Sequence, residues 1–357
     1  MPTNHKKILI IQAGFTLVEV MVGLAIGMLA TIVIMQVFTV FEAQKRTTTG
    51  TADAQTNGSI AMYNIGREMQ LAGFPLMPAG VAGVADSAIE CSTVTVDGAA
   101  DTTPASNFSR LTPATITDGT SDTLAIRYGN SLGGGIPETI TAVGAPTAND
   151  ITVANNLGCQ AGDTALIVNG GTCALSAASA VSGTTTVTLA NTAVAVAGAS
   201  LSCLGSWSAT TFAVNNGNLE RNGIPGVVGV VNLQAQYGVS TVANSNQITQ
   251  WVDATGGTWL APSVANRNRI KAVRVAVVAR NAKKEAKDPA TNACVTTTAC
   301  SSTTSAAPTG LCAWEGSALS PAPAIDLTAD ADWGCYRYRV FETIIPLRNM
   351  VWSKGTL

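Results

Sequence analysis

The chain has 357 residues, of which 12% are charged, and its formal net charge is −2. This balance gives no electrostatic indication of a partner. The abundance of Thr, Ser, Ala, Gly and Asn argues against a mainly helical chain and is typical of bacterial surface β-proteins. The length suffices for one large or two modest domains besides a leader and a membrane span.

The first informative segment is an apolar run over residues 15–41. It contains no Lys, Arg, Asp or Pro and one acidic residue, Glu19. At about 1.5 Å per residue, a helix of this length crosses a hydrocarbon core of about 30 Å. A carboxylate inside such a span costs on the order of 2–3 kcal/mol. The sequence therefore predicts a membrane-spanning helix in which Glu19 requires a positive partner.

The residues before the span define the kind of signal. Lys6 and Lys7 precede Gly14, and the apolar segment follows this glycine, the reverse of the order in a secretory signal peptide. Cleavage between Gly14 and Phe15 would leave the span on the mature chain and create an ammonium group one helical turn from Glu19. The two lysines orient the bulk of the chain outward. The alternative is an uncleaved signal anchor.

The order Gly14, Phe15, Thr16 and Glu19 resembles the class III signal of type IV prepilins. This resemblance implies that a prepilin peptidase cuts after Gly14 and methylates the new N-terminus at Phe15. It also implies that Phe15, Thr16 and Glu19 act in assembly, where the carboxylate pairs with the N-terminal ammonium group of a neighbouring subunit.

The helical pattern continues beyond the span to Gly73, with Pro75 just after it. The sequence thus predicts one helix of roughly 55 residues. Its first half, residues 15–41, would lie in the membrane or the filament core. Its second half, residues 42–73, would dock a narrow apolar stripe on a sheet. A leader over residues 1–14 and a β-rich head over residues 74–357 complete the predicted division.

The head shows strands of period two, with irregular segments over residues 79–120 and 283–331. An Asn215-Asn216-Gly217 turn indicates a hairpin. The predicted strands are residues 123–128, 165–168, 184–189, 211–214, 230–237, 248–252, 270–279 and 336–345. One face of each of the last two strands is expected to pack on the helix.

Eight cysteines lie beyond the span, and their even number predicts disulfides in an oxidising compartment. They are Cys91, Cys159, Cys173, Cys203, Cys294, Cys300, Cys312 and Cys335. A zinc site is the weaker alternative, because there is no Cys-x-x-Cys pair and the single histidine lies in the leader. The shortest loops would join Cys294 to Cys300, Cys312 to Cys335 and Cys159 to Cys173, leaving Cys91 with Cys203.

The inventory of reactive groups argues against an enzyme. The mature chain would have no histidine, and it has neither a Gly-x-Ser-x-Gly elbow nor a phosphate-binding loop. No cofactor is expected. Asp326, Asp330 and Asp332 could together hold calcium, but they lack the spacing of an EF-hand, so a solvated turn is the favoured interpretation.

A basic run offers a second alternative, a DNA-binding module. Its members are Arg267, Arg269, Lys271, Arg274, Arg280, Lys283, Lys284 and Lys287. Alternation along a strand divides them between two faces, and no aromatic residue lies among them for base stacking. A solvated strand edge is therefore favoured, and nucleic acid is not an expected partner.

Further segments resemble the PilW family of minor pilins. They are residues 52–58, 67–68, 72–74, 122–124, 127–129, 231–238, 270–274 and 346–350. The resemblance implies an α+β type IV pilin fold, in which a long N-terminal helix packs on an antiparallel sheet head with disulfide-bonded loops. It further implies a non-catalytic subunit that primes pilus assembly, with a candidate place at the tip. Alternatives are a type II secretion pseudopilin and an adhesive or DNA-binding module of an uptake pilus.

The same resemblance implies the location and the partners. The chain would reside in the bacterial inner membrane with a periplasmic head and then enter a pilus at the cell surface. Its partners would be prepilin peptidase, other minor pilins, the major pilin and, as a further candidate, a tip adhesin.

Overall fold

The computed structural model describes residues 14–76, 91–100, 111–133, 135–145, 147–243, 245–294 and 296–352. Contacts within the chain separate two units, Met1–Thr49 and Gly50–Leu357, and the boundary falls inside the first helix. Each unit is described below by itself. The predicted division at residues 14, 41 and 73 remains a prediction.

The first helix, α1 (Leu17–Leu71), has the predicted length of 55 residues. It stops where the sequence predicts, because Gly73 adopts a left-handed conformation with φ of 80° and Pro75 follows. The amide of Gly73 donates to the carbonyl of Arg127 at 2.8 Å, which fixes the helix end to a strand of the head.

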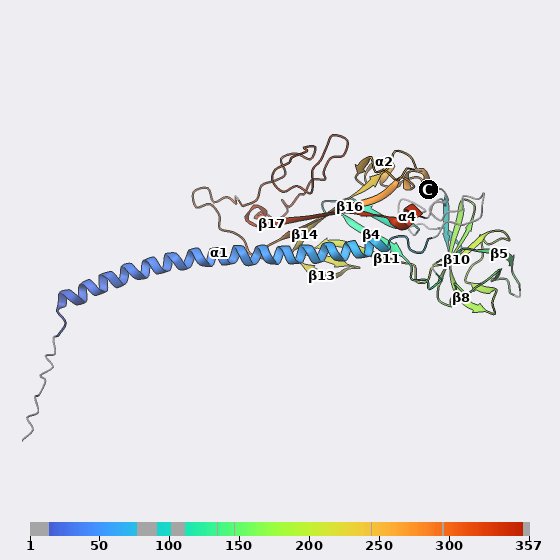
Figure 1. Ribbon diagram of the computed structural model, residues 1–357, viewed down its shortest axis with the longest axis horizontal. Helices are drawn as coiled ribbons and strands as arrows, with labels where there is room; N and C mark the ends of the chain where they lie inside the picture. The colour runs from blue at the N-terminus through green and yellow to red at the C-terminus, as the bar shows by residue number, and fades with distance from the viewer. Residues whose placement is uncertain are drawn as a thin grey trace, which may run out of the picture. The chain divides into compact units, whose positions relative to one another are not determined.

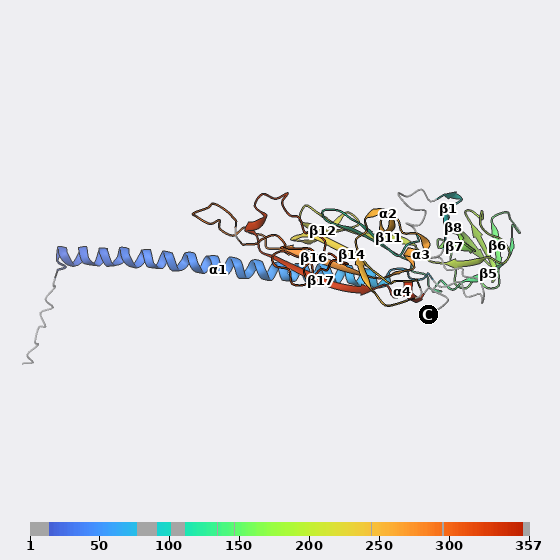
Figure 2. The ribbon, with the colours of Figure 1, turned by 90° about the horizontal axis from the view of Figure 1, so that it is seen from above.

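Two antiparallel sheets form the pilin part of the head (Figures 1 and 2). The first has the order β15-β14-β16-β17 and consists of β15 (Gln250–Val252), β14 (Val230–Val239), β16 (Ile270–Arg280) and β17 (Tyr338–Pro346). The second has the order β13-β12-β11-β4-β3 and consists of β13 (Ile224–Val228), β12 (Asn218–Arg221), β11 (Ser208–Asn215), β4 (Thr123–Tyr128) and β3 (Ala114–Thr117). Two short helices, α2 (Gly256–Trp259) and α3 (Val264–Arg267), precede β16, and a third, α4 (Arg348–Trp352), follows β17.

The second half of α1 shares one hydrophobic core with both sheets. Ile65 and Met69 are fully buried, and they join Phe212 of β11 and Val275 of β16 in the same cluster. This burial of an apolar stripe is what the sequence predicts for residues 42–73. At about 25 cal/mol per Å², the buried area of such side chains is the main favourable contribution to folding.

A buried carboxylate links the two sheets. Asp122, just before β4, accepts hydrogen bonds from the amide of Ala235 in β14 at 2.7 Å and from the amide of Gly119 at 3.1 Å. Burial raises the pKa of Asp122 to about 7, although these two hydrogen bonds act in the opposite direction. The side chain thereby holds the β3–β4 turn against the neighbouring sheet.

A third sheet of eight strands lies between β4 and β11 in the chain, apart from its β1 and β2. It consists of β1 (Thr93–Val96), β2 (Ala99–Ala100), β5 (Glu138–Val143), β6 (Asp150–Val153), β7 (Thr164–Asn169), β8 (Thr172–Ser182), β9 (Thr186–Leu189) and β10 (Ser200–Cys203). The order β8-β7-β10-β5-β6-β9 closes on itself, because β9 also pairs with β8. The strands enclose their own core, which includes Ile140, Ile151, Ile167 and Leu201. We call residues 129–207 the barrel insertion.

The outer face of the four-stranded sheet carries a long loop. Between β16 and the 3₁₀ helix η2 (Trp333–Cys335), the described residues contain no strand or helix and one isolated bridge, Ala299 with Leu311. Trp314 of this loop packs on Ala276 of β16. The predicted loop over residues 283–331 is thus confirmed, and β16 is buried on both faces rather than on one.

The eight predicted strands are all present as β4, β7, β9, β11, β14, β15, β16 and β17, with ends shifted by a few residues. The predicted hairpin is also confirmed. Asn215 pairs with Asn218, and the two turn residues between them, Asn216 and Gly217, have φ of 49° and 73°. The expectation of an irregular segment over residues 79–120 is wrong where it is described, since β1, β2 and β3 lie there, and its remainder lies outside the described residues.

The close approach of α1 to β17 yields a matched pair of substitutions. A Cβ at Gly58 would lie 2.1 Å from Cε2 of Phe341, whereas one at Gly66 meets no atom within 4 Å. Gly58→Ala is expected to lower the free energy of unfolding by about 1–3 kcal/mol through overpacking. Gly66→Ala is expected to raise it by about 0.5–1 kcal/mol. Urea unfolding of the detergent-solubilised chain measures both, and an equal gain for both variants would contradict the packing of Phe341 on Gly58.

Candidate processing and assembly site

The N-terminal motif forms a capped helix start. Thr16 precedes α1, and its Oγ1 accepts a hydrogen bond from the amide of Glu19 at 3.3 Å, while its carbonyl accepts from the amide of Val20 at 3.2 Å. Thr-x-x-Glu is the spacing of a capping box. Assigning these residues to a class III signal does not by itself reveal this helix-capping role. Thr16 therefore fixes where the helix begins, and Glu19 lies in its first turn, the favourable end of the helix dipole for an acidic side chain.

The residues at the cleavage point are accessible. Phe15 is 83% exposed, and no atom lies within 4 Å of the position that a Cβ would take at Gly14. The side chain of Glu19 is exposed as well. Within the described chain, the structure thus presents Gly14, Phe15, Thr16 and Glu19 on one short, uncovered segment.

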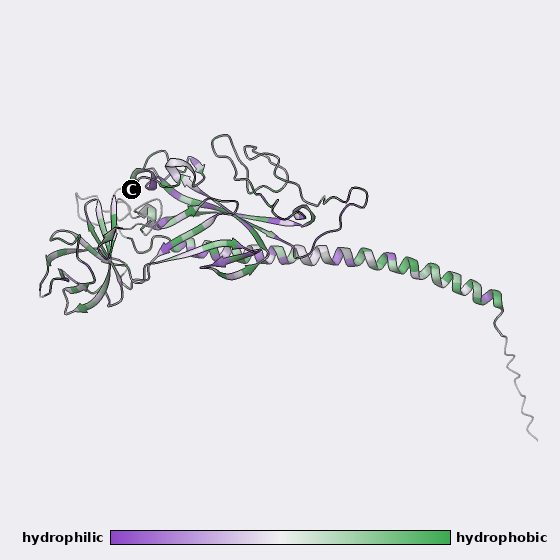
Figure 3. Cartoon of the chain, turned by 180° about the vertical axis from the view of Figure 1, so that it is seen from behind, coloured by the Kyte–Doolittle hydropathy of each residue, from purple (hydrophilic) through white to green (hydrophobic). Residues whose placement is uncertain are grey.

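The helix that follows has an apolar surface on all sides. It is the single helix in the described residues that is long and apolar enough to span a membrane, with a mean hydropathy of 2.5 over 18 residues. In Figure 3 the N-terminal half of the helix is coloured mainly as hydrophobic residues. Its large side chains from Leu17 to Phe41 are exposed within the single chain. Such a surface is stable only against lipid or other helices.

The other end of α1 carries an ion pair at Glu68, which lies in one of the segments that resemble the PilW family. Glu68 accepts hydrogen bonds from the hydroxyl of Tyr128 on β4 at 2.5 Å and from Arg221 on β12 at 2.9 Å. The sequence does not predict this pairing, because Tyr128 and Arg221 are 60 and 153 residues away from Glu68 in the chain. Glu68 positions the helix against the five-stranded sheet.

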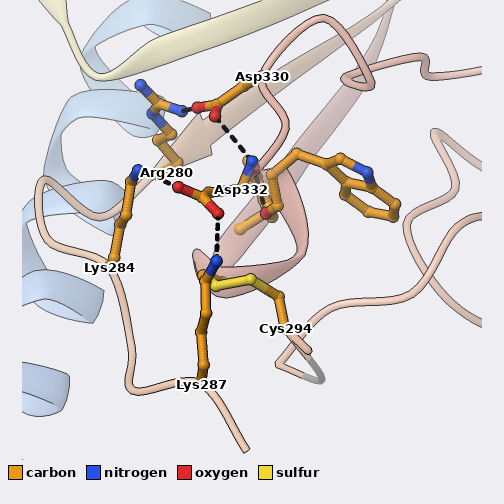
Figure 4. A network of polar contacts seen from close by, with 9 residues as sticks. Arg280, Lys284, Lys287, Cys294, Asp330 and Asp332 are labelled. Carbon is orange, nitrogen blue, oxygen red and sulfur yellow. Dashed lines mark hydrogen bonds and ion pairs between the residues drawn. A yellow bond between two sulfur atoms is a disulfide. The ribbon is translucent and has the colours of Figure 1, made fainter. Parts of the chain in front are cut away.

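The three aspartates considered as calcium ligands are engaged with other groups, as Figure 4 shows for Asp330 and Asp332. Asp332 pairs with Lys284 at 2.5 Å and Lys287 at 2.9 Å, and Asp330 pairs with Arg280 at 3.0 Å. Asp326 accepts a hydrogen bond from Thr328 at 2.6 Å. Cations already neutralise two of these carboxylates, so this cluster does not fit a calcium site.

One group in the described residues has the spacing of metal ligands, Asp332 with Cys294 and Cys335. Both sulfur atoms are consumed in the disulfide between Cys294 and Cys335. A disulfide offers no thiolate to a metal ion. The cluster is therefore a structural clamp, in which ion pairs and a disulfide together hold the start of the long loop to η2.

The electrostatics of this clamp follow from its contacts. Hydrogen bonds from Lys284 and Lys287 lower the pKa of Asp332 to about 2. The same contact with Asp332 raises the pKa of Lys284. Burial works against ionisation of Asp330, but the amide of Asp332 and the guanidinium of Arg280 hold its pKa below the ordinary value.

The basic run does not form a continuous cationic surface. Arg267 and Lys271 are 2% and 3% exposed, and they donate to the carbonyls of Cys91 and Ala243. Arg274 lies between the rings of Trp251 and Trp314, at 4.9 Å and 4.2 Å from their centroids. Most of these cations thus serve internal contacts, and the structure offers little support for phosphate binding.

The described cysteines form four disulfides, and all four predicted pairings are wrong. The structure joins Cys91 to Cys173, Cys159 to Cys203, Cys294 to Cys335 and Cys300 to Cys312. The prediction assumed that each cysteine pairs with a partner close to it in sequence. Parallel pairing of β1 with β8 instead brings residue 91 beside residue 173, although they are 82 residues apart in sequence.

Comparison with known families agrees with this geometry. A family model described as the prokaryotic N-terminal methylation motif matches residues 11–35, which include the capped helix start. Together with the long apolar helix, the antiparallel sheets and the four disulfides, this match defines an α+β type IV pilin-like protein. No curated protein and no solved structure matches the chain.

A second family model, described as type IV pilus-assembly protein W, matches residues 208–349. This segment contains β11 to β17 and the loop clamp. The two matches together support a PilW-like type IV pilin. Its methylation signal and apolar helix are features of membrane-anchored, pilus-associated chains.

The clamp predicts a pH dependence of stability. Because the pKa of Asp332 in the folded chain is about 2, below its ordinary value of 3.8, its stabilising effect is complete above about pH 4. This effect is lost as the pH falls through 2. Asp332→Asn is expected to be less stable than the native chain at pH 7 and equally stable near pH 2.

Urea unfolding at a series of pH values measures this difference. Glu315→Gln is the control, because Glu315 is exposed and has no ion pair within the described part of the chain. It is expected to leave stability unchanged at every pH. A difference between Asp332→Asn and the native chain that is constant from pH 7 to pH 2 would rule out the ion pairs as its cause.

Proposed function

We propose that this chain is a minor pilin that acts through protein contacts and not through catalysis. In this proposal, prepilin peptidase removes residues 1–14 and methylates the amine of Phe15. The apolar half of α1 then resides in the inner membrane with the head in the periplasm. From there the subunit enters a pilus, where it primes assembly with other minor pilins, next to the major pilin or an adhesin at the tip.

The single observation that carries the proposal is the uncovered N-terminal segment. It joins a capped helix start with Glu19 in its first turn to an apolar surface with no partner in the described chain. In a bundle of such helices, the surfaces would cover one another, and the ammonium group of one chain could neutralise Glu19 of the next. The ammonium group and the carboxylate would then pass from the membrane into the filament as a neutral pair.

The alternatives receive different support. A type II secretion pseudopilin would carry the same N-terminal segment, so the filament from which the chain is recovered distinguishes the two. A DNA-binding module would need free cations, and Arg267, Lys271 and Arg274 are committed to internal contacts.

Processing is tested by substitution at the cleavage point. Gly14→Ser is expected to block maturation, because the peptidase in the resembling family requires the glycine before the cut. Mass spectrometry of the native chain should find a peptide that begins with N-methylated Phe15 in sheared filaments. In the variant, the intact leader should remain in the membrane fraction. An unchanged mature mass for Gly14→Ser would show that the signal assignment is wrong.

Assembly is tested at Glu19. Glu19→Val removes the charge and suits the membrane, so its membrane level is expected to equal that of the native chain. Its level in sheared filaments is expected to fall at least tenfold. Glu19→Asp, which keeps the carboxylate, is the matched control and should retain most incorporation. Native levels of Glu19→Val in filaments would refute a role of the carboxylate in assembly.

A further inference from the structure

The barrel insertion interrupts a β-hairpin of the pilin head. Tyr128, the last residue of β4, pairs directly with Ser208, the first residue of β11, and the register continues through Ala125 with Thr211. Residues 129–207 therefore stand where a short hairpin turn would suffice. The family match begins at residue 208, where β11 resumes.

The two connections to the barrel run side by side. The amide of Ser131 donates to the carbonyl of Leu204 at 3.1 Å, and the amide of Ser206 donates to the side chain of Asn130 at 2.7 Å. A domain whose ends meet in this way can be inserted into a loop without disturbing the host fold. Figure 1 shows β5, β8 and β10 grouped together, away from β14, β16 and β17.

The barrel has its own means of stability. Its strands close into a ring around a separate core, and the disulfide between Cys159 and Cys203 lies within it. A second disulfide, from Cys91 to Cys173, attaches β1 to β8. None of the core of the barrel is shared with α1. The helix and the barrel thus depend on different contacts.

The composition of the insertion restricts its partner. Residues 129–207 contain no Lys, Arg or His, and most of them are Thr, Ser, Asn, Gly or Ala. A surface without cations cannot attract a polyanion such as DNA or a sulfated glycan. Hydroxyl and amide groups instead suit a neutral partner rich in hydroxyl groups.

A cleft of about 390 Å³ lies where the barrel meets the interrupted hairpin. Its walls include Trp207, Asp97, the hydroxyl-bearing residues Thr164, Ser176 and Ser208, and Arg127 of β4, whose guanidinium donates to the carbonyl of Thr112 and the hydroxyl of Thr115. The carboxylate of Asp97 is held in place by the amide of Ala177, at 3.2 Å. This volume falls within the range of small-ligand sites. An indole wall beside fixed polar groups suits a sugar ring, which has apolar faces and hydroxyl edges.

We propose that the barrel insertion is a recognition module, separate from the assembly part of the pilin, that binds a neutral saccharide in the cleft at its base. The inference rests on the proposed function, since the filament would display the module. The helix and the two pilin sheets carry assembly. The barrel would bind saccharides outside the filament.

Binding is tested first on the full-length chain in detergent. The probes are immobilised neutral oligosaccharides, namely maltotriose, cellotriose, lactose and chitotriose, with heparin as the polyanion. We expect at least one neutral probe to bind and heparin not to bind. Trp207→Ala is expected to weaken this binding at least tenfold, and Leu157→Ala, at an 83% exposed barrel position outside the cleft, should leave it unchanged. No binding to any neutral probe, equal binding to heparin, or native binding by Trp207→Ala would overturn the proposal.

Separation from assembly is tested by replacing residues 129–207 with Asn-Gly, together with Cys91→Ser to remove the unpaired thiol. We expect this variant to accumulate and to enter sheared filaments within twofold of the native level, while losing saccharide binding. Failure to accumulate, or to enter filaments that contain the native chain, would overturn the proposal. If the native chain is itself absent from filaments, the proposed function fails, whereas the binding assay on the full-length chain still judges the saccharide site.

Discussion

The burial of one apolar stripe of α1 under two sheets is the interaction on which the rest of the head depends. Ile65 and Met69 contribute fully buried side chains from the helix, and Phe212 and Val275 meet them from different sheets. Because the same helix is apolar on every side before residue 42, a single element must satisfy two environments. Gly58 and Glu68 adapt its second half to the head, the first by admitting the ring of Phe341 and the second by pairing with Arg221.

Much of this architecture follows from the sequence, because its signals are local. The helix length, the stop at Gly73 and the Asn216-Gly217 turn each depend on a few adjacent residues. The barrel is predicted only in part, since β7 and β9 are among the predicted strands but β5, β6, β8 and β10 are not. Strands such as β5, β6 and β10 are four to six residues long, so their alternation of polar and apolar residues covers too few positions to be distinctive in a chain rich in Thr, Ser and Ala. They become strands because the closed ring pairs each with its neighbours and buries apolar residues such as Ile140, Ile151 and Leu201.

The candidate sites differ in the same way. The residues of the N-terminal motif are neighbours in the sequence, so no long-range folding is needed to bring them together. The structure presents them on one uncovered segment. The basic run and the three aspartates suggest ligands only until their partners are known. Arg280 pairs with Asp330, and Lys284 pairs with Asp332, since the long loop folds back over η2. Residue types can be read from a sequence, but the distances that pair them cannot.

The connectivity of the disulfides bears on how the chain oxidises. Three of the four bonds join cysteines that are not consecutive in the chain: Cys91 with Cys173 and Cys159 with Cys203 interleave, and Cys294 with Cys335 encloses the fourth bond. An oxidant that linked thiols in order of emergence would first join Cys91 to Cys159 and thereby trap a non-native loop. Reaching the native set from that point requires thiolate attack and mixed disulfides. Oxidation in chain order would therefore make isomerisation part of the maturation of this head, whereas folding before oxidation would place the native partners together.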